Sequence, residues 1–541
     1  MKTKFNQILT LFIALLVQVS FAQEKTISGT VSDDSGALPG VSVVVEGTSK
    51  GVETDFDGKY SIKANQGDVL TFSYLGYATS KETVGTGNTI NVTLQEGSEM
   101  LEEITIGLGI SKAEKAIGYA VQKVSGENIN KAKEPNLVNS LQGRVAGVQV
   151  TSGGGPGAAP VIRIRGYATT NDNSPLYVID GIQTTDANVM RDINPKDIEN
   201  ISVLKDGSAA IYGARASNGV IVVTTKKGSY NSKNTFEVSA TYGISEVTRS
   251  PDMLNVQQHA DMTWQSILND GNVPSHPQYG SGPTPSVPVF LNVPMPSGPE
   301  YDGAGAKVQP GGTKWFDEVF DPADVTEVSV SASGGSAKEN FRMSVGYKNQ
   351  IGTSVGTDFE SVTGTFTYKR KAGRVDIVTS NRVTNAIQNG IHEGSSYFGA
   401  PQMTRLFMSP FQQPKNPDGS WNINLSTSVF NTPYLAEKNI QQNDGTRALS
   451  NTTITYRVTD DIKFRTRYAI DFTLGVSHEY RDPHHGDANG TNGYAYQNTS
   501  RSFTWSSNNS LEFDKTIDDI HFISAVAQME FQKNKYTYIF I

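Results

Sequence analysis

Few residues of this sequence have the types and spacing that metal or nucleophilic chemistry requires. Among its seven histidines, His484 and His485 are adjacent and are followed by Asp487, a combination that could bind a metal ion. These residues lie among Pro, Gly and Asn residues between two predicted strands, a context that favours a mobile surface loop. The sequence has no His-Glu-x-x-His, no Gly-x-Ser-x-Gly and no recognisable pair of catalytic carboxylates. It therefore predicts no enzyme, no catalytic residue and no metal site.

A second group of candidates lies at the turn that contains Asp55, Asp57 and Gly58. Two aspartates beside a glycine could begin a calcium loop, but the later ligands of such a loop are missing, so we expect a plain turn. Gly58-Lys59 lacks the flanking residues of a phosphate-binding loop. The absence of cysteine excludes disulfides and thiolate chemistry. We therefore predict no cofactor.

The elements that recur in the second half of the chain are strands of alternating polarity. In the clearest one, seven uncharged residues share a face: Phe464, Thr466, Tyr468, Ile470, Phe472, Leu474 and Val476. The opposite face is polar or charged, with Lys463, Arg465, Arg467, Asp471, Thr473 and Ser477. Segments 236–244, 328–332, 341–347 and 454–458 repeat the pattern. A lipid-facing barrel wall requires such uncharged faces, because a charge at the bilayer midplane costs roughly 2–4 kcal/mol, but a soluble β-sandwich alternates in the same way.

Composition and the N-terminus narrow the class of protein. The net charge of −8 argues against nucleic acid as a partner, and 52 glycines with 23 prolines fit a turn-rich β protein. Residues 1–22 have two lysines, a short apolar run and a small-residue end, which predicts a signal peptide cleaved after Ala22. Without a cysteine there is no lipoprotein anchor. The predicted location is therefore the periplasm, the outer membrane or the medium.

Two segments follow the signal peptide. Residues 23–96 alternate short strands with turns, which is typical of a small β-sandwich. The stretches Ile27–Val31, Leu38–Val41, Thr54–Ile62 and Leu75–Tyr77 resemble the carboxypeptidase regulatory-like domain. The linker 97–113 contains a short β-prone segment that could add as a strand to the sheet edge of a partner, although an ordinary linker can have this composition too.

Residues 135–228 alternate short helices and strands, as in a compact mixed domain. Its motifs are Asn139–Val148, Gly153–Gly157, Val161–Gly166, Pro175–Gly181, Ile198–Gly207 and Ser208–Lys226. Together with the signal peptide and the regulatory-like segment, these motifs resemble a SusC/RagA-type TonB-dependent outer-membrane transporter. The resemblance implies that this region is the plug and that the alternating strands after it belong to a β-barrel.

The same resemblance implies a mechanism and partners. In such transporters the Ton box lies just before the plug, and the residues in that place here are Glu103, Ile104, Thr105, Ile106 and Gly107. A TonB-type energy-coupling protein would bind this segment by strand addition and supply work, since the sequence has no nucleotide motif. A SusD-like lipoprotein would close the extracellular mouth, and the substrate would be an oligosaccharide or a peptide.

We therefore expect a mainly β chain located in the cell outer membrane, in contact with its lipid. The predicted domains are a signal peptide (1–22), a regulatory-like β-sandwich (23–96), a linker with the Ton-box-like segment (97–113), a mixed α/β plug (114–228) and an incomplete antiparallel transmembrane β-barrel (229–541). The last region has room for about nine strands, whereas a plugged transporter barrel has 22. Because an open sheet edge in lipid costs several kcal/mol per unpaired backbone group, we expect the sequence to be a fragment of a longer transporter.

Two further expectations concern loops and alternatives. Residues 273–299 hold eight prolines, which excludes a central strand and predicts a long loop, either a substrate vestibule or a solvated connector. Met253–Leu268 is predicted to be a helix of the same excursion.

The alternative class is a secreted or periplasmic β-rich binding protein whose sandwich holds a glycan or a surface partner. A truncated product that is exported and degraded is also compatible with the motifs.

Overall fold

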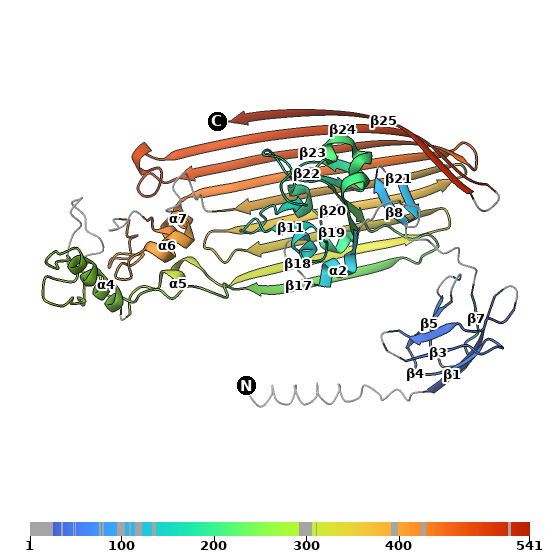
Figure 1. The fold of residues 1–541 in the computed structure, drawn as a ribbon, viewed down its shortest axis with the longest axis horizontal. Coiled ribbons are helices and arrows are strands. Elements are labelled where there is room, and N and C mark those ends of the chain that lie inside the picture. Colours follow the sequence, from blue (N-terminus) through green and yellow to red (C-terminus); the bar gives the residue numbers. More distant parts are fainter. Residues whose placement is uncertain are drawn as a thin grey trace. The chain divides into compact units, whose positions relative to one another are not determined.

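A computed structural model describes most of the chain (Figure 1). The described residues are 25–94 except 34–35, 47, 49, 75–76 and 78–79, then 103–107, 110–113, 122–131, 137–291, 306–309, 311–390, 399–423, 429–517 and 521–540. The predicted signal peptide (1–22), the last three prolines of segment 273–299 and Ile541 lie outside them. Contacts divide the chain into two compact units, one of residues 1–104 with 111–118 and one of residues 105–110 with 119–541.

The N-terminal unit contains two small sheets that face each other across an apolar core. One sheet has the strand order β4 (Lys59–Ala64), β1 (Lys25–Ser32) and β7 (Val92–Thr93), and the other has the order β3 (Gly51–Glu53), β2 (Ser42–Val45), β5 (Val69–Ser73) and β6 (Ser80–Thr83). Ile27, Val43, Leu70 and Phe72 are fully buried between them. The alternating burial of β4 explains its alternating sequence, since every second side chain faces this core.

The turn between β3 and β4 is stabilised by Asp55. Its carboxylate accepts hydrogen bonds from the backbone N–H groups of Asp57 at 3.0 Å and Lys59 at 2.8 Å. This is an Asx-type turn, in which the side chain satisfies backbone donors that the strands leave unpaired. Gly58, at φ 71°, supplies the left-handed residue that the turn needs. The expectation of a turn at this position is confirmed.

The plug region is built on a mixed sheet. Its five strands have the order β10 (Gln122–Ser125), β15 (Ile198–Leu204), β16 (Val220–Thr225), β13 (Leu176–Ile179) and β14 (Ile182–Thr184). β13 and β16 are parallel and almost entirely buried, which explains why their sequences are continuous apolar runs. The region also contains a two-stranded sheet of β11 (Val148–Thr151) and β12 (Val161–Ile164). Its short helices are α2 (Gly126–Lys131), η2 (Leu137–Leu141), α3 (Asn188–Arg191), η3 (Pro195–Asp197) and η4 (Asp206–Ala216).

Nine antiparallel strands follow in sequence order and form one sheet (Figure 1). They are β17 (Thr235–Ser245), β18 (Ala323–Gly335), β19 (Glu339–Ile351), β20 (Asp358–Ala372), β21 (Val375–Asn389), β22 (Ile440–Arg457), β23 (Ile462–Arg481), β24 (Tyr494–Ile517) and β25 (His521–Phe540). Among the described strands, β17 and β25 each pair with one neighbour, so the sheet does not close into a barrel. The predicted fold class, including the incomplete barrel, is confirmed.

The two faces of this sheet have opposite chemistry. On β23 the uncharged residues Phe464, Tyr468 and Ile470 are exposed on the outer face, whereas Arg467 and Asp471 are buried on the inner face. The plug packs on that inner face. Exposed apolar side chains continue over all nine strands, a far larger apolar surface than a soluble monomer presents. The alternation in the sequence therefore separates an outer apolar wall from an inner polar wall.

The connections at the two ends of the sheet also differ. At one end the strands are joined by short turns, and at the other end lie the long excursions that contain α4 (Val256–Asn269), α5 (Trp315–Val319), α6 (Pro401–Phe407) and α7 (Thr432–Lys438) (Figure 1). A further short helix, η6 (Asn489–Thr491), lies between β23 and β24. The helix predicted at Met253–Leu268 is confirmed as α4, which begins three residues later, after the N-cap Asn255.

Among the described helices, none is both long enough and apolar enough to cross a membrane.

Candidate functional site: the plug against the inner face of the sheet

The Ton-box-like residues form a strand. Glu103, Ile104, Thr105, Ile106 and Gly107 make up β8, which forms a two-stranded sheet with β9 (Ile110–Ala113). A β conformation is what strand addition to a partner requires. The binding of a TonB-type protein to this segment stays a prediction.

One plug–sheet contact is built on the tight turn between β13 and β14. Asp180 adopts a left-handed conformation at φ 49°, and its carboxylate accepts hydrogen bonds from the backbone N–H (2.9 Å) and the hydroxyl (2.7 Å) of Thr225. The side-chain amide of Asn451 on β22 donates to the backbone oxygen of Asp180 at 2.7 Å. The guanidinium of Arg467 lies over Gly181, where a Cβ would be 2.1 Å from its Nη1. The φ of 92° favours glycine at this position, and a Cβ there would in addition displace the guanidinium of Arg467.

A second contact is a buried ion pair at the end of η3. Asp197 is 3% exposed and accepts from the guanidinium of Arg342 at 3.1 Å and from the hydroxyl of Ser344 at 2.5 Å, both on β19. The hydroxyl of Thr365 on β20 is 3.4 Å from the same carboxylate. Removing one member of a buried pair leaves the other charge without compensation, at about 3–5 kcal/mol. The pair therefore fixes the plug on β19 and β20.

A third contact uses one arginine for two carboxylates. Arg447 on β22 donates to Asp471 on β23 at 3.0 and 2.6 Å, a bidentate arrangement. The same guanidinium reaches the plug, donating to Asp186 at 2.8 Å and to the hydroxyl of Thr184 at 3.1 Å. Arg447 is 5% exposed. Arg447, held by Asp471 within the wall, thus also binds the plug carboxylate of Asp186.

Between these contacts lies a further group of buried charges. Asp192 is 7% exposed, and burial raises the pKa of its carboxyl above the ordinary range, against the opposing effect of Arg191 and Arg447. Arg191 binds Asp192 at 3.1 Å. Arg382 on β21 is buried within electrostatic reach of Asp180, Asp192 and Asp197. The plug therefore presents a row of carboxylates to the arginines of the wall.

The glycine-rich turn of the plug makes a contact of another kind. Gly157, at φ 66°, lies against the ring of Phe359 on β20, and a Cβ at this glycine would be 2.0 Å from the ring. The guanidinium of Arg191 lies 5.4 Å from the centre of the same ring, and it donates to the backbone oxygen of Gly157 at 3.3 Å. The turn is therefore held by shape and by a cation–π contact.

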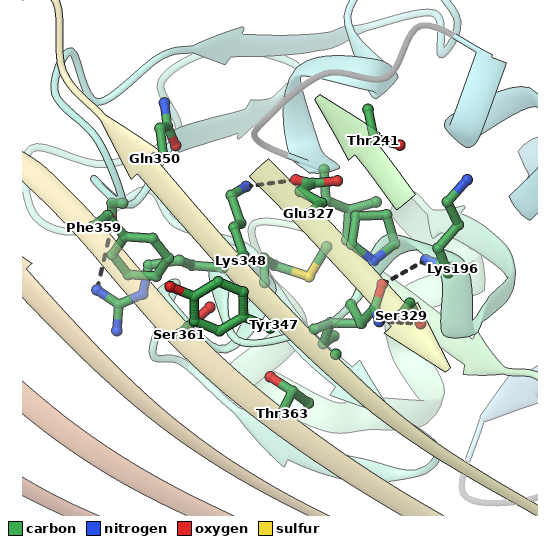
Figure 2. Close-up of a pocket in the computed structure, with 18 of the residues that line it drawn as sticks. Lys196, Thr241, Glu327, Ser329, Tyr347, Lys348, Gln350, Phe359, Ser361 and Thr363 are labelled. Atoms are coloured by element: carbon green, nitrogen blue, oxygen red, sulfur yellow. Dashed lines mark hydrogen bonds and ion pairs between the residues drawn. The ribbon is translucent and has the colours of Figure 1, made fainter. Parts of the chain in front are cut away.

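A cavity of about 250 Å³ separates the plug from strands β17–β20 (Figure 2). Glu327 on β18 and Lys348 on β19 are directly opposite each other in the sheet, and their side chains meet in this space at 3.2 Å. Gly154 and Gly155 of the glycine-rich turn line the cavity from the plug side, and Ser361 lines it from β20. This cavity is more than ten times the volume that a single bound water needs.

The long connections have cores of their own. His259 on α4 contacts the hydroxyl of Tyr279 through Nδ1 at 2.8 Å, and His276 stacks on the same tyrosine with ring centres 4.5 Å apart. Burial lowers the pKa of both histidines. Together with Trp264 and Phe411, these residues form an ordered subdomain beyond the sheet. Residues 273–291 lie within it and form no strand, as their prolines predicted.

The expectation for the histidine pair needs correction. His484 is exposed, as predicted, but His485 is buried, and its Nε2 accepts a hydrogen bond from the backbone N–H of Asn431 at 2.8 Å. Its ring packs on Phe430 and Tyr434, which belong to a connection far away in the sequence. His485 therefore lies in a packed loop core and not in a mobile surface loop. Among the described residues, no group of three or more His, Cys, Asp or Glu could hold a metal ion.

The sequence pattern identified the sheet residues of the plug–sheet contacts but not their partners on the plug. The inward charges Arg342, Arg467 and Asp471 stood out from the alternation of their strands. Their plug partners, Asp186 and Asp197, carry no comparable signal, because an aspartate at a turn or helix end is most often a capping residue.

Comparison with known proteins agrees with this architecture. Residues 27–106 match the CarboxypepD_reg-like domain family, and residues 113–220 match the TonB-dependent Receptor Plug Domain family. The chain is similar to TonB-dependent receptor P26 of Formosa agariphila, at 32% identity over 94% of this chain and 49% of the relative. It is also similar to TonB-dependent receptor SusC of Bacteroides thetaiotaomicron, at 31% identity over 81% of this chain and 42% of the relative.

Among solved structures, the RagAB peptide importer in its open-open state superposes with a TM-score of 0.66 and 24% identity, over 81% of this chain and 50% of that one. This likeness shows the shared fold. The chain spans about half the length of the relatives that it matches. With its regulatory-like sandwich, its plug and its unclosed nine-stranded sheet, the chain belongs to the SusC/RagA-type TonB-dependent receptors.

Proposed function

We propose that this chain supplies the plug and part of the wall of an outer-membrane importer that takes up a large nutrient and is energised by a TonB-type protein. The observation that carries the proposal is the pairing of the plug carboxylates with buried arginines of the sheet, while the opposite face of the same strands is uncharged. This arrangement suits a wall that faces lipid outside and a plug inside.

The plug–sheet contacts imply that opening needs external work. When the plug leaves the wall, Arg342 loses the carboxylate of Asp197, and Arg447 loses that of Asp186 but keeps Asp471 on the wall, so these buried contacts must first be broken. The outer membrane has no ATP, and the sequence has no nucleotide-binding motif. Force applied to β8 by a TonB-type partner, bound by strand addition, would supply this work.

The proposal extends to the partners and the substrate, by analogy with the relatives. SusC and the RagAB peptide importer support a large solute, an oligosaccharide or a peptide, and a SusD-like surface lipoprotein that closes over the long connections. The ordered subdomains around α4–α7 would form the surface that such a lid contacts.

The proposal includes the order of the domains. The signal peptide is cleaved after Ala22, the sandwich spans residues 23–96, the linker with the Ton box spans 97–113, the plug spans 114–228, and the wall strands begin after Gly228. Export without lipidation then delivers the protein to the outer membrane.

A crosslinking experiment tests energy coupling without knowledge of the substrate. A photoreactive amino acid replaces Ile106 in the transporter expressed from its native gene, and the matched control carries it at Lys63, an exposed residue of β4. We expect an adduct with a TonB-type protein at position 106 and none at position 63.

The crosslinking result and the cell fraction that contains the protein distinguish a transporter from a soluble binding protein. Equal adducts at both positions, or none at position 106, would contradict the proposal. Recovery of the protein from the periplasm without detergent would instead support the alternative, a binding protein that uses its sandwich to hold a glycan or a surface partner.

A further inference from the structure

The plug meets the two halves of the sheet in different ways. On the side of β22 and β23, Leu449 and Ala469 are buried in the same apolar cluster as the plug residues Tyr177 and Ile179, so the plug core continues into the wall. No residue of β17–β20 belongs to that cluster. On the β17–β20 side the cavity of about 250 Å³ lies between the plug and the wall, and a hydrogen bond of 3.0 Å from the amide of Asn194 to the hydroxyl of Ser329 crosses it. The interface is thus packed on one side and hollow on the other.

Specific contacts close the hollow side at both ends. At the end of the sheet with the long connections, Gly157 and Arg191 lie against Phe359. Toward the end with the short turns, Asp197 binds Arg342 and Ser344. The register of β19 and β20 places the cavity between these two contact sets, because Gly346 and Lys348 line it and follow Ser344 along β19.

The cavity wall combines apolar side chains, such as Leu137, Met190 and Ile193, with hydrogen-bonding groups. Two of its basic side chains have carboxylate partners, Lys348 with Glu327 and Arg191 with Asp192. Hydroxyl and amide groups from both walls supply further donors and acceptors, among them Asn139 and Ser152 of the plug and Gln350 and Ser361 of the sheet. Such a mixed lining can contact both the polar groups and the carbon skeleton of a solute.

We propose that this cavity is a closed section of the solute path, and that the importer opens between the plug and strands β17–β20 while the plug stays attached to β22 and β23. The inference rests on the proposed import function and deepens it by naming the route. The two closing contacts act as an outer gate at Phe359 and an inner gate at Asp197. Opening this side requires the loss of the ring contact at Phe359, the bonds of Asp197 to Arg342 and Ser344, and the hydrogen bond from Asn194 to Ser329, and it leaves the shared apolar core intact.

The absence of cysteine from the sequence permits a direct test in the transporter expressed from its native gene. Ser361→Cys places a thiol in the cavity, and the matched control Ala469→Cys places one in the packed interface, where alanine is 3% exposed. Cells are treated with a membrane-impermeant thiosulfonate reagent, with and without a working TonB system. We expect the thiol at position 361 to react at least about tenfold faster when TonB works, the change that a 1.4 kcal/mol shift of the opening equilibrium produces, and the thiol at 469 to stay unreactive.

A disulfide provides the second measurement. A Cβ at Gly346 would lie 3.7 Å from the Cβ of Asn194, within the range for a disulfide, so Asn194→Cys/Gly346→Cys should tie the plug to β19 beside the cavity. We expect oxidation of this pair to abolish the TonB-dependent labelling at position 361, and a reductant to restore it. The control pair Val44→Cys/Gly51→Cys, with a corresponding distance of 3.9 Å inside the sandwich, should leave the labelling unchanged.

The outcomes separate this proposal from the import function. TonB-dependent reaction at both 361 and 469 would mean that the whole plug leaves the wall, and would overturn the proposed route while import stands. A thiol at 361 whose reaction does not depend on TonB, in a protein that still forms the adduct at position 106, would also overturn it. Loss of that adduct would count against the proposed function itself.

Discussion

The inner and outer faces of the nine-stranded sheet are made by alternate residues of the same strands, yet they follow opposite rules. On β23 the inner residues Arg467 and Asp471 are charged and buried, whereas the outer residues Tyr468 and Ile470 are uncharged and exposed. Several inner charges have a partner from the plug, as Arg342 has in Asp197. The outer face exposes large apolar side chains on all nine strands.

The difference shows what determines the register of the wall. Because side chains alternate with a period of two, a slip of one residue would place Arg467 in lipid and Ile470 against the plug carboxylates. Both changes would be unfavourable, by roughly 2–4 kcal/mol for a charge at the bilayer midplane. The plug contacts on one face and the membrane contact on the other therefore favour the same strand register.

The largest effect is expected from breaking an inner pair. Asp197→Ala removes the carboxylate that binds Arg342 and Ser344, and should destabilise the plug on the wall by about 3–5 kcal/mol, because the arginine stays buried without its partner. Protease accessibility of the plug in increasing urea, measured in vesicles, checks this. The double variant Asp197→Ala/Arg342→Leu should regain part of the loss. A double variant no more stable than the single one would show that the pair does not hold the plug.

A smaller effect is expected from a charge on the outer face. Ile470→Arg places a guanidinium where Ile470 is 39% exposed, and should destabilise the wall by roughly 2–4 kcal/mol if it faces lipid near the midplane. The urea midpoint of the transporter in phospholipid vesicles reports the change, with Ile470→Val as the control. A midpoint equal to that of the control would argue that this face does not contact lipid.

Burial also disfavours a charge in the loop core around His485. Burial lowers the pKa of this histidine from 6.5 to about 4, so the neutral form is favoured in the folded loop. The free energy of unfolding is therefore unaffected by this histidine above pH 6.5. It decreases as the pH falls toward 4, because the unfolded loop binds the proton more tightly, and the loss is about 1.4 kcal/mol at pH 5.5. Proteolysis of the loop at pH 7.5 and 5.5 should show this loss. His485→Gln, which keeps an acceptor but does not titrate, should abolish the pH dependence; an unchanged dependence would assign it to another group.

The smallest effect is expected from outer polar groups that pair with each other. The hydroxyls of Thr379 and Thr452 lie 3.0 Å apart on the outer face, on β21 and β22. Thr379→Val/Thr452→Val removes donor and acceptor together and should change stability by less than about 1 kcal/mol. The same urea titration checks this. A large loss would mean that these hydroxyls have a further role that the uncharged face does not explain.

The sequence predicted the wall better than the plug contacts for a physical reason. A lipid-facing strand must repeat its pattern along its length, so Phe464 to Val476 specified both a strand and its faces. The small sandwich was similarly accessible through its turns, although β3 and β6 have only three and four residues and are too short to show a pattern of their own.

The contacts between plug and wall could not be predicted in this way. Asp186 and Arg447 are 261 residues apart in the sequence, and no local pattern connects them. The burial of His485 has the same origin, since its partners Asn431 and Tyr434 come from a different connection. Loop composition indicates a loop, but the packing of one loop on another depends on the tertiary structure.

If the uncharged face of the sheet contacts lipid and the charged face holds the plug, adjacent residues of β23 lie in different environments. Single cysteines at 467, 468, 470 and 471 of the transporter from native outer membranes, each carrying a spin label, test it through collisions with oxygen, which concentrates in lipid, and with a water-soluble nickel complex. We predict high oxygen accessibility at 468 and 470 and low accessibility to both reagents at 467 and 471. Equal accessibility at neighbouring positions, or nickel contact at 468 and 470, would contradict the account.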